Sequence, residues 1–253
     1  VSEACSQNDG GKRRKGYSTN DHAMRDMIMQ IPSDGQIEIG STGFRFIRID
    51  CLSPNTTMYL KEAPAIFRYR NIPYLGSFRC NDQRLNDIWM TGAYTVHLNM
   101  QEYLWDGIKR DRLIWLGDMH PEVATIMSVF GHNEVVNKSI DLACEQFPLP
   151  QWLNGINTYS MWYLIIQHEW YMHNGDIDFL RHHRAYITGV IDRIDECVDE
   201  EGNENLAKQR FLDWPSSPNK PGVEAGCRAL LSWALKDAEV LCNLLEEQEQ
   251  DKK

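Results

Sequence analysis

The sequence has no Cys-x-x-Cys pair, and its seven cysteines are scattered along 253 residues. An odd, scattered set is typical of mostly buried free thiols rather than of a disulfide framework or a metal cluster. No stretch approaches the roughly 20 apolar residues that a membrane-spanning helix requires. The chain begins at Val1, without methionine or a charged and apolar leader. We therefore expect a fragment or a processed product, with any targeting signal outside this sequence.

The sequence also lacks an excess of positively charged residues. The net charge is −10 at pH 7 and the basic residues gather on no predicted face, so neither nucleic acid nor an anionic membrane is an expected partner. The sequence holds no Gly-x-Ser-x-Gly motif, no Gly-rich phosphate loop and no Cys–His nucleophile pattern, which leaves nucleophilic catalysis and nucleotide binding without support. Aromatic residues, in contrast, are plentiful, with 8 Trp and 10 Tyr. An acidic, aromatic-rich surface suits neutral ligands such as sugars.

The histidines give no metal-binding pattern along the chain. His182 and His183 are adjacent, and His168 lies five residues before His173. No carboxylate accompanies either pair at the spacing that metal ligands usually show in a sequence, and solvated or core histidines are more common. The sequence therefore predicts no metal and no other cofactor.

The first third of the chain divides into two segments. Residues 1–34 are polar and contain a basic run, Lys12 to Lys15, which predicts an irregular, mobile segment with a solvated charge run rather than a recognition patch. Within residues 35–75, apolar and polar residues alternate at period two, most clearly from Phe44 to Ile49, and glycines and prolines separate the runs. This pattern predicts three or four half-buried β-strands, too few to close a sandwich by themselves.

From Asn81 onward the apolar residues recur at helical spacing, and Asn81 is a suitable N-cap for the first helix. Residues 76–253 are therefore predicted to be mainly α-helical, in antiparallel pairs joined by short loops. After the first helix, the expected ones cover about 121–130 (opened by Pro121), 134–145, 160–173, 176–198 and 222–247.

The stretch from Trp105 to Asp118, WDGIKRDRLIWLGD, combines three carboxylates, three cations, two tryptophans and two glycines. Gly107 and Gly117 favour a loop that turns back at both glycines over one unbroken helix. Either conformation brings the carboxylates together beside aromatic rings and guanidinium charge, where their pKa values can separate. One acid and one base cleave a glycosidic bond, and a tryptophan face suits a sugar ring. Composition alone equally allows an exposed loop with ion pairs, anchored by buried tryptophans.

The spacing of Asp106, Asp111 and Asp118, five and seven residues, followed by Met119-His120-Pro121-Glu122, resembles the acidic signature of family 78 glycoside hydrolases, the α-L-rhamnosidases of the six-hairpin glycosidase superfamily. The approach from Gly76 to Gly107 and the stretches Tyr159 to Trp162 and Phe211 to Trp214 carry the same resemblance, which extends from about residue 35 to about residue 245.

The resemblance implies an (α/α)6 toroid preceded by a β-sandwich. About six helices would correspond to the first half of that ring, and residues 35–75 would be the last strands of the sandwich. Half a ring leaves apolar helix faces that a missing C-terminal half or another chain would cover.

The resemblance also implies roles for individual residues. Asp111 falls at the general acid of an inverting cleavage of terminal α-L-rhamnose, Asp106 and Asp118 at sugar-binding carboxylates, and Trp115 at a sugar-contacting aromatic. The family's acid is usually glutamate, so the shorter Asp111 requires a closer backbone approach or transfer of the role to a neighbour. Other candidate substrate-binding residues are Arg110, Trp152, Trp162, Asp213 and Trp214.

Each of these further candidates has an ordinary structural alternative. Trp152 and Trp162 can simply pack the entry of a helix, and Asp213 can cap a turn beside a packed Trp214. The family's general base is a glutamate on a loop beyond this region, and Glu224 is the candidate within the chain. We expect the isolated chain to be weakly active or inactive. A non-catalytic sugar-binding module, an inactive truncation and a toroidal glycosidase for another sugar are the alternatives.

Overall fold

The computed structural model describes residues 28–32, 35–40, 42–44, 46–108, 111–206 and 210–250. The basic run from Lys12 to Lys15 lies outside these ranges, as do Cys5 and Arg110. The chain forms two compact units: residues 1–69 together with Gly107–Leu113, and Arg70–Asp106 together with Ile114–Lys253. Each unit is described separately below.

The described residues of the first unit form no helix. Phe46 is the one residue with a β-bridge among the described residues from 35 to 69, and none of them is assigned to a strand. Many apolar side chains in this segment are exposed, including Phe44, Tyr59 and Phe67, whereas a sandwich covers such faces with a second sheet. A backbone hydrogen bond from Gly43 N to Ile108 O, 2.9 Å long, ties in the segment from Gly107. The sandwich strands of residues 35–75 stay a prediction.

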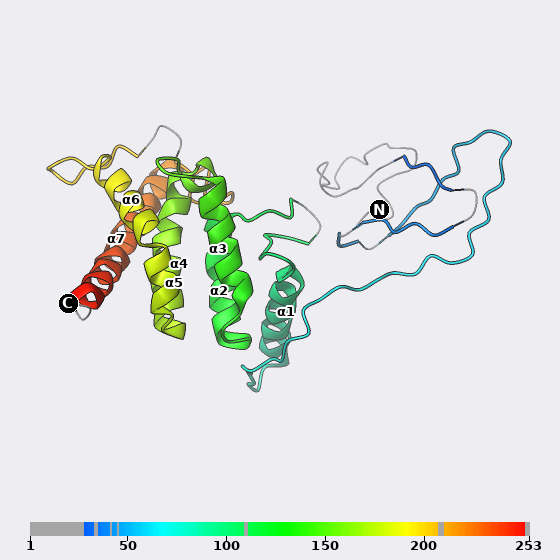
Figure 1. Ribbon diagram of the computed structural model, residues 1–253, viewed down its shortest axis with the longest axis horizontal. Coiled ribbons are helices and arrows are strands. Elements are labelled where there is room, and N and C mark those ends of the chain that lie inside the picture. The colour runs from blue at the N-terminus through cyan, green and yellow to red at the C-terminus, as the bar shows by residue number, and fades with distance from the viewer. Residues whose placement is uncertain are drawn as a thin grey trace. The chain divides into compact units, whose positions relative to one another are not determined.

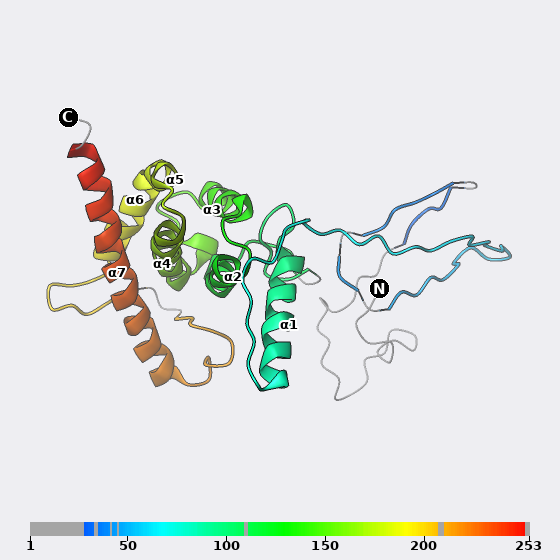
Figure 2. The ribbon, with the colours of Figure 1, turned by 90° about the horizontal axis from the view of Figure 1, so that it is seen from below.

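The second unit is helical (Figure 1). Helix α4 packs against α2 on one side and α7 on the other, and α2 also packs against α1. Figure 2 shows this row of helices from α7 through α4 and α2 to α1. The elements are α1 (Gln83–Asn99), α2 (Leu116–Val129), α3 (Glu134–Gln146), the short 3-10 helix η3 (Leu153–Gly155), α4 (Asn157–Asn174), α5 (Ile177–His182), α6 (Arg184–Asp195) and α7 (Lys220–Gln250).

The mainly helical prediction is confirmed, with three corrections to boundaries. The N-cap of α1 is Asp82 rather than Asn81, because the Asp82 carboxylate accepts from Arg84 N at 2.9 Å. Helix α2 begins at Leu116, five residues before Pro121. The single helix expected over 176–198 is divided at His183 into α5 and α6.

Burial explains where α2 begins. Leu116 and Met119 are fully buried in the common core, so starting the helix at Leu116 lets both side chains pack in the interior while their backbone is hydrogen-bonded. Helix α4 is the centre of that core, since Tyr163, Leu164 and Ile165 have no exposed surface.

The six described cysteines are all free, from the exposed Cys51 to the buried Cys227. The described cysteines are thus free, as expected, but the expectation that they are mostly buried is wrong, because Cys227 is the one buried cysteine among the six. None of the described helices is both long and apolar enough to cross a membrane.

Candidate active site

Asn154 fixes the backbone where the motif enters α2. Its Nδ2 donates to Ile114 O at 2.9 Å, and its Oδ1 accepts from Leu116 N at 3.0 Å. Asn154 has a left-handed backbone with φ of 53°, a conformation that asparagine adopts more readily than most residues. The Leu116 N–H has no intrahelical acceptor because it belongs to the first turn of α2. The segment before α4 thus fixes the backbone at Ile114 and Leu116 through the oxygen and the nitrogen of the Asn154 side-chain amide.

Gly117 allows α2 to approach α4 closely. The sequence predicted that the motif turns back at this glycine. This is wrong, because Gly117 lies in the first turn of α2. A Cβ at position 117 would lie 2.2 Å from the ring of Tyr159, so any side chain would force the two helices apart. Trp115, two residues before Gly117, meets the same Tyr159 ring edge to face, with centroids 6.2 Å apart and planes at 85°.

Two acidic residues of the motif, Asp106 and Asp118, act electrostatically on both Tyr159 and a third acidic residue, Glu122. Burial raises the pKa of Glu122 to about 8, with further contributions from the charges of Asp106 and Asp118. Burial also raises the pKa of Tyr159 to about 12, and Asp118 and Asp106 contribute again. Two of the three predicted motif carboxylates therefore act on the same two buried groups. Asp118 lies in the first turn of α2, where the helix dipole stabilises negative charge.

Glu122 is a further candidate residue that spacing along the sequence did not single out. Its side chain is buried, its Oε1 accepts from Asn99 Nδ2 at 3.2 Å, and its Oε2 has no partner among the described residues. With a pKa of about 8 it is protonated at neutral pH. The signal was present in the sequence, because Glu122 follows Asp118 by four residues and so shares its face of a helix.

Asp111, the predicted acid, lies in the segment Gly107–Leu113, which groups with the first unit of the chain. Asp111 and Arg112 are consecutive residues with positive φ, 37° and 55°. Left-handed backbone at two successive non-glycine residues costs free energy, and such conformations cluster at functional sites. The neighbouring Arg110 lies outside the described residues.

Trp214 is joined to Tyr159 through the ring of Phe211. Phe211 lies 6.2 Å from the Tyr159 ring centroid and 5.1 Å from that of Trp214, and Thr158 Oγ1 donates to Phe211 O at 2.8 Å. Trp214 is 77% exposed, so it is not the packed residue of the structural alternative.

Asp213 itself caps a turn. Its Oδ1 accepts from Ser216 N at 2.6 Å, and hydrogen bonds from the side chain and backbone of Ser216 lower its pKa. The carboxylate is thus ionised and oriented by the turn.

The remaining two tryptophans contact other groups. The Arg193 guanidinium of α6 lies over the Trp152 ring, 5.2 Å from its centroid. Trp162 of α4 stacks on His120 at 4.6 Å and meets Trp233 of α7 at 5.6 Å. Neither tryptophan is recorded in a ring contact with Trp115 or Tyr159 among the described residues, so their substrate role stays a prediction.

The described residues around Tyr159 carry groups whose chemistry suits a neutral, hydroxyl-rich ligand. Two aspartates supply acceptors, Trp115 and Trp214 supply ring faces, and the protonated Glu122 avoids a third negative charge at neutral pH. Acceptors beside ring faces match the hydroxyls and the apolar side of a pyranose.

Comparison with known proteins gives a consistent result. Residues 73–251 match the bacterial alpha-L-rhamnosidase 6 hairpin glycosidase domain. Among solved structures, the chain is similar to a GH78 family rhamnosidase of Bacillus sp. GL1, with a TM-score of 0.52 and 19% identity. The alignment covers 71% of this chain and 22% of the Bacillus protein. No curated protein sequence matches the chain.

Proposed function

Because the chain belongs to the bacterial α-L-rhamnosidase six-hairpin glycosidase family, we propose that it carries the acid and sugar-binding part of an inverting α-L-rhamnosidase site. The observation that carries this proposal is the joint action of Asp106 and Asp118 on the buried Glu122 and Tyr159, beside Trp115. A pair of carboxylates next to an aromatic face supports binding of the terminal sugar of a glycan or glycoside.

In this proposal Asp111 protonates the departing glycosidic oxygen. Asp106 and Asp118 accept hydrogen bonds from hydroxyls of the terminal rhamnose, and Trp115 contacts its apolar side. The remaining pocket walls are Trp152, Trp162 and Trp214, with Arg110 and Asp213 as polar contacts. The assignment of Asp111 rests on the motif spacing, and the strained backbone at Asp111 and Arg112 supports a functional role there.

Inversion needs a second carboxylate about 6.5–9.5 Å from the acid to activate water. Glu224 is exposed on α7. Its charge helps to raise the pKa of Arg210, after the larger effect of Glu204. Neither observation indicates that Glu224 is the general base. The chain spans 22% of the length of the Bacillus rhamnosidase. We therefore assign the base to residues beyond these 253, which makes the chain alone a weak catalyst.

Azide can test this division of labour, since a small anion can replace a missing base and its water as the nucleophile. We expect little release of the chromophore from an aryl α-L-rhamnoside by the chain alone, and faster release with azide, giving the inverted glycosyl azide. Asp111→Asn should abolish that rescue. Asp178→Asn, at an exposed position of α5, is the matched control.

Rescue that survives Asp111→Asn would contradict the acid assignment. Turnover without azide would place the base inside the chain, with Glu224→Gln as the next variant. A panel of aryl glycosides tests which sugar the site prefers. A preference for another glycoside would refute rhamnose specificity.

A sugar-binding module without catalysis is the second candidate. The 77% exposed Trp214, linked to Tyr159 through Phe211, favours it, because an exposed aromatic face can bind sugar without a base. Saturable L-rhamnose binding by a chain that shows no azide rescue would support the module over the enzyme.

A further inference from the structure

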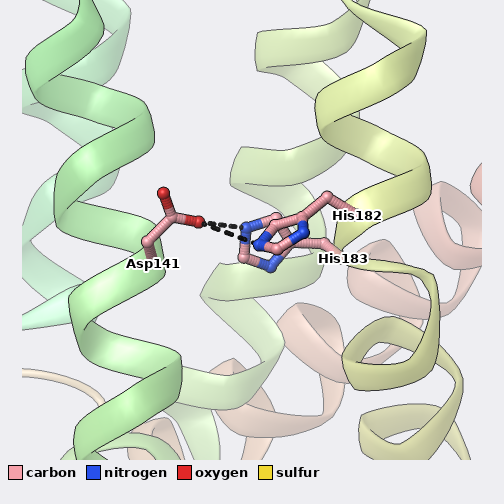
Figure 3. Close-up of side chains that lie close together, drawn as sticks. All are labelled: Asp141, His182 and His183. Atoms are coloured by element: carbon pink, nitrogen blue, oxygen red, sulfur yellow. Dashed lines mark hydrogen bonds and ion pairs between the residues drawn. The ribbon is translucent and has the colours of Figure 1, made fainter.

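A second cluster of chemically reactive side chains lies away from the motif, where α3 faces the junction of α5 and α6. Figure 3 shows Asp141 of α3 opposite His182 and His183, with both imidazoles directed at the same carboxylate. The Asp141 Oδ1 atom lies 2.9 Å from His183 Nε2 and 3.7 Å from His182 Nε2. We propose that these three side chains bind a divalent transition-metal ion of the zinc type, which links α3 to the α5–α6 junction.

The geometry fits the ligand set. Zinc bonds imidazole nitrogen and carboxylate oxygen at about 2.0–2.2 Å, so adjacent ligand atoms of a tetrahedral site lie about 3.4 Å apart. The two measured separations bracket that value, and the three ligand atoms all lie within 4.8 Å of one another. Two imidazoles and one carboxylate form a common protein ligand set for zinc and leave a fourth position for water.

The buried histidine is already oriented as a ligand. His183 is 3% exposed, and its Nδ1 lies 3.2 Å from the hydroxyl of the fully buried Tyr163. When Nδ1 carries the proton and donates it to this hydroxyl, the lone pair of Nε2 points at the metal position. Metal-bound histidines usually have such a partner on the second ring nitrogen. Cys144 Sγ lies 3.8 Å from the same Nδ1, and so on the side of the ring away from the metal position.

His182 distinguishes a metal site from a simple hydrogen-bonded pair. Asp141 and His183 alone already satisfy each other at 2.9 Å. The His182 side chain is 71% exposed, so water could solvate it in many rotamers, yet it is turned toward the same carboxylate oxygen. A shared cation explains why two adjacent histidines converge on one oxygen. The change of helix at His183, between α5 and α6, allows this convergence.

A hydrated ion can reach the cluster. The Asp141 side chain is 39% exposed and lines a surface cavity of about 300 Å³ together with Glu102, Lys138 and Glu145. Three carboxylates against one ammonium give this cavity a negative potential, which attracts cations. Sequence spacing did not reveal the site because the carboxylate precedes His183 by 42 residues.

Calorimetric titration of the chelator-treated 253-residue chain with ZnCl2 at pH 7 tests the proposal. We expect one equivalent of zinc to bind, with a rise in melting temperature because only the folded state assembles the ligands. His182→Ala and Asp141→Asn should each weaken binding at least about tenfold, the smallest loss that removal of even an outer-shell partner usually causes. His182→Ala is informative about binding alone, since an exposed side chain contributes little to folding.

His173→Ala provides the matched control, because His173 is another exposed helical histidine and stacks on Trp170 outside the cluster. It should leave zinc affinity unchanged. Cobalt substitution adds a spectroscopic test, in which a strong near-ultraviolet charge-transfer band would mark thiolate ligation by a cysteine. No binding, binding that survives both cluster variants, or a thiolate band would each overturn the proposal.

Discussion

Replacement of Glu122 by glutamine tests the electrostatics of the site. Burial, followed by the charges of Asp106 and Asp118, raises the pKa of Glu122 from 4.5 to about 8. A carboxyl with a higher pKa in the folded state binds more protons when folded, so the folded state loses stability as the pH rises from 4.5 to 8. Each pH unit in that interval is worth about 1.4 kcal/mol, and the loss approaches about 5 kcal/mol above pH 8.

Glutamine has the shape of the protonated acid and does not titrate. Its carbonyl oxygen can still accept from Asn99 Nδ2, which lies 3.2 Å from Glu122 Oε1. Its amide group takes the place of Oε2, which has no partner among the described residues. We therefore expect Glu122→Gln to match the natural chain at pH 5 within about 1 kcal/mol and to exceed its stability by about 3–4 kcal/mol at pH 8.

Urea unfolding at pH 5, 6, 7 and 8, followed by tryptophan fluorescence and circular dichroism, measures this difference if the slopes stay equal. Glu145→Gln is the matched control, because it removes a carboxyl that water already solvates on the exposed side of α3. A difference between Glu122→Gln and the natural chain that stays constant from pH 5 to pH 8 would refute the assigned protonation.

Two further substitutions test how the site is held. Gly117→Ala should cost about 1–3 kcal/mol, because its Cβ would lie 2.2 Å from the Tyr159 ring, whereas Gly92→Ala, with open space around its Cβ, should stabilise α1 by about 0.5–1 kcal/mol. Thermal unfolding of both variants measures the contrast, and equal effects would contradict the close approach. Asn154→Ala should cost about 2–3 kcal/mol in urea unfolding, because it removes two backbone-directed hydrogen bonds; a loss below about 0.5 kcal/mol would show that Asn154 does not hold α2.

Helical periodicity predicted the fold well because it reports burial along one face. The helical spacing that begins at Asn81 corresponds to α1, and the helices expected over about 134–145 and 160–173 correspond to α3 and α4. The sequence was less reliable where tertiary packing decides the local structure. Gly117 signals a turn by its propensity, but a helix runs through it because only glycine lets α2 approach Tyr159.

The site shows the same division. Asp106, Asp118 and Trp115, whose sugar-binding roles stay a proposal, could be grouped from the sequence because they lie within one short motif. Asn154 could not, because the hydrogen bonds that define its role cross 38 and 40 residues of sequence. The Asp141–His183 pair was missed for the same reason. Sequence spacing can identify functional residues that lie on one helix or loop. Residues that two packed helices bring together can be identified only once the fold is known.

The central claim is that the motif binds L-rhamnose through its carboxylates and Trp115. Calorimetric titration of the folded 253-residue chain with L-rhamnose, beside Trp115→Ala, tests it most directly. We predict saturable binding by the natural chain, weakened at least about tenfold in the variant, which corresponds to loss of one aromatic contact worth about 1.4 kcal/mol. No binding by a demonstrably folded chain, or equal binding by Trp115→Ala, would contradict the account.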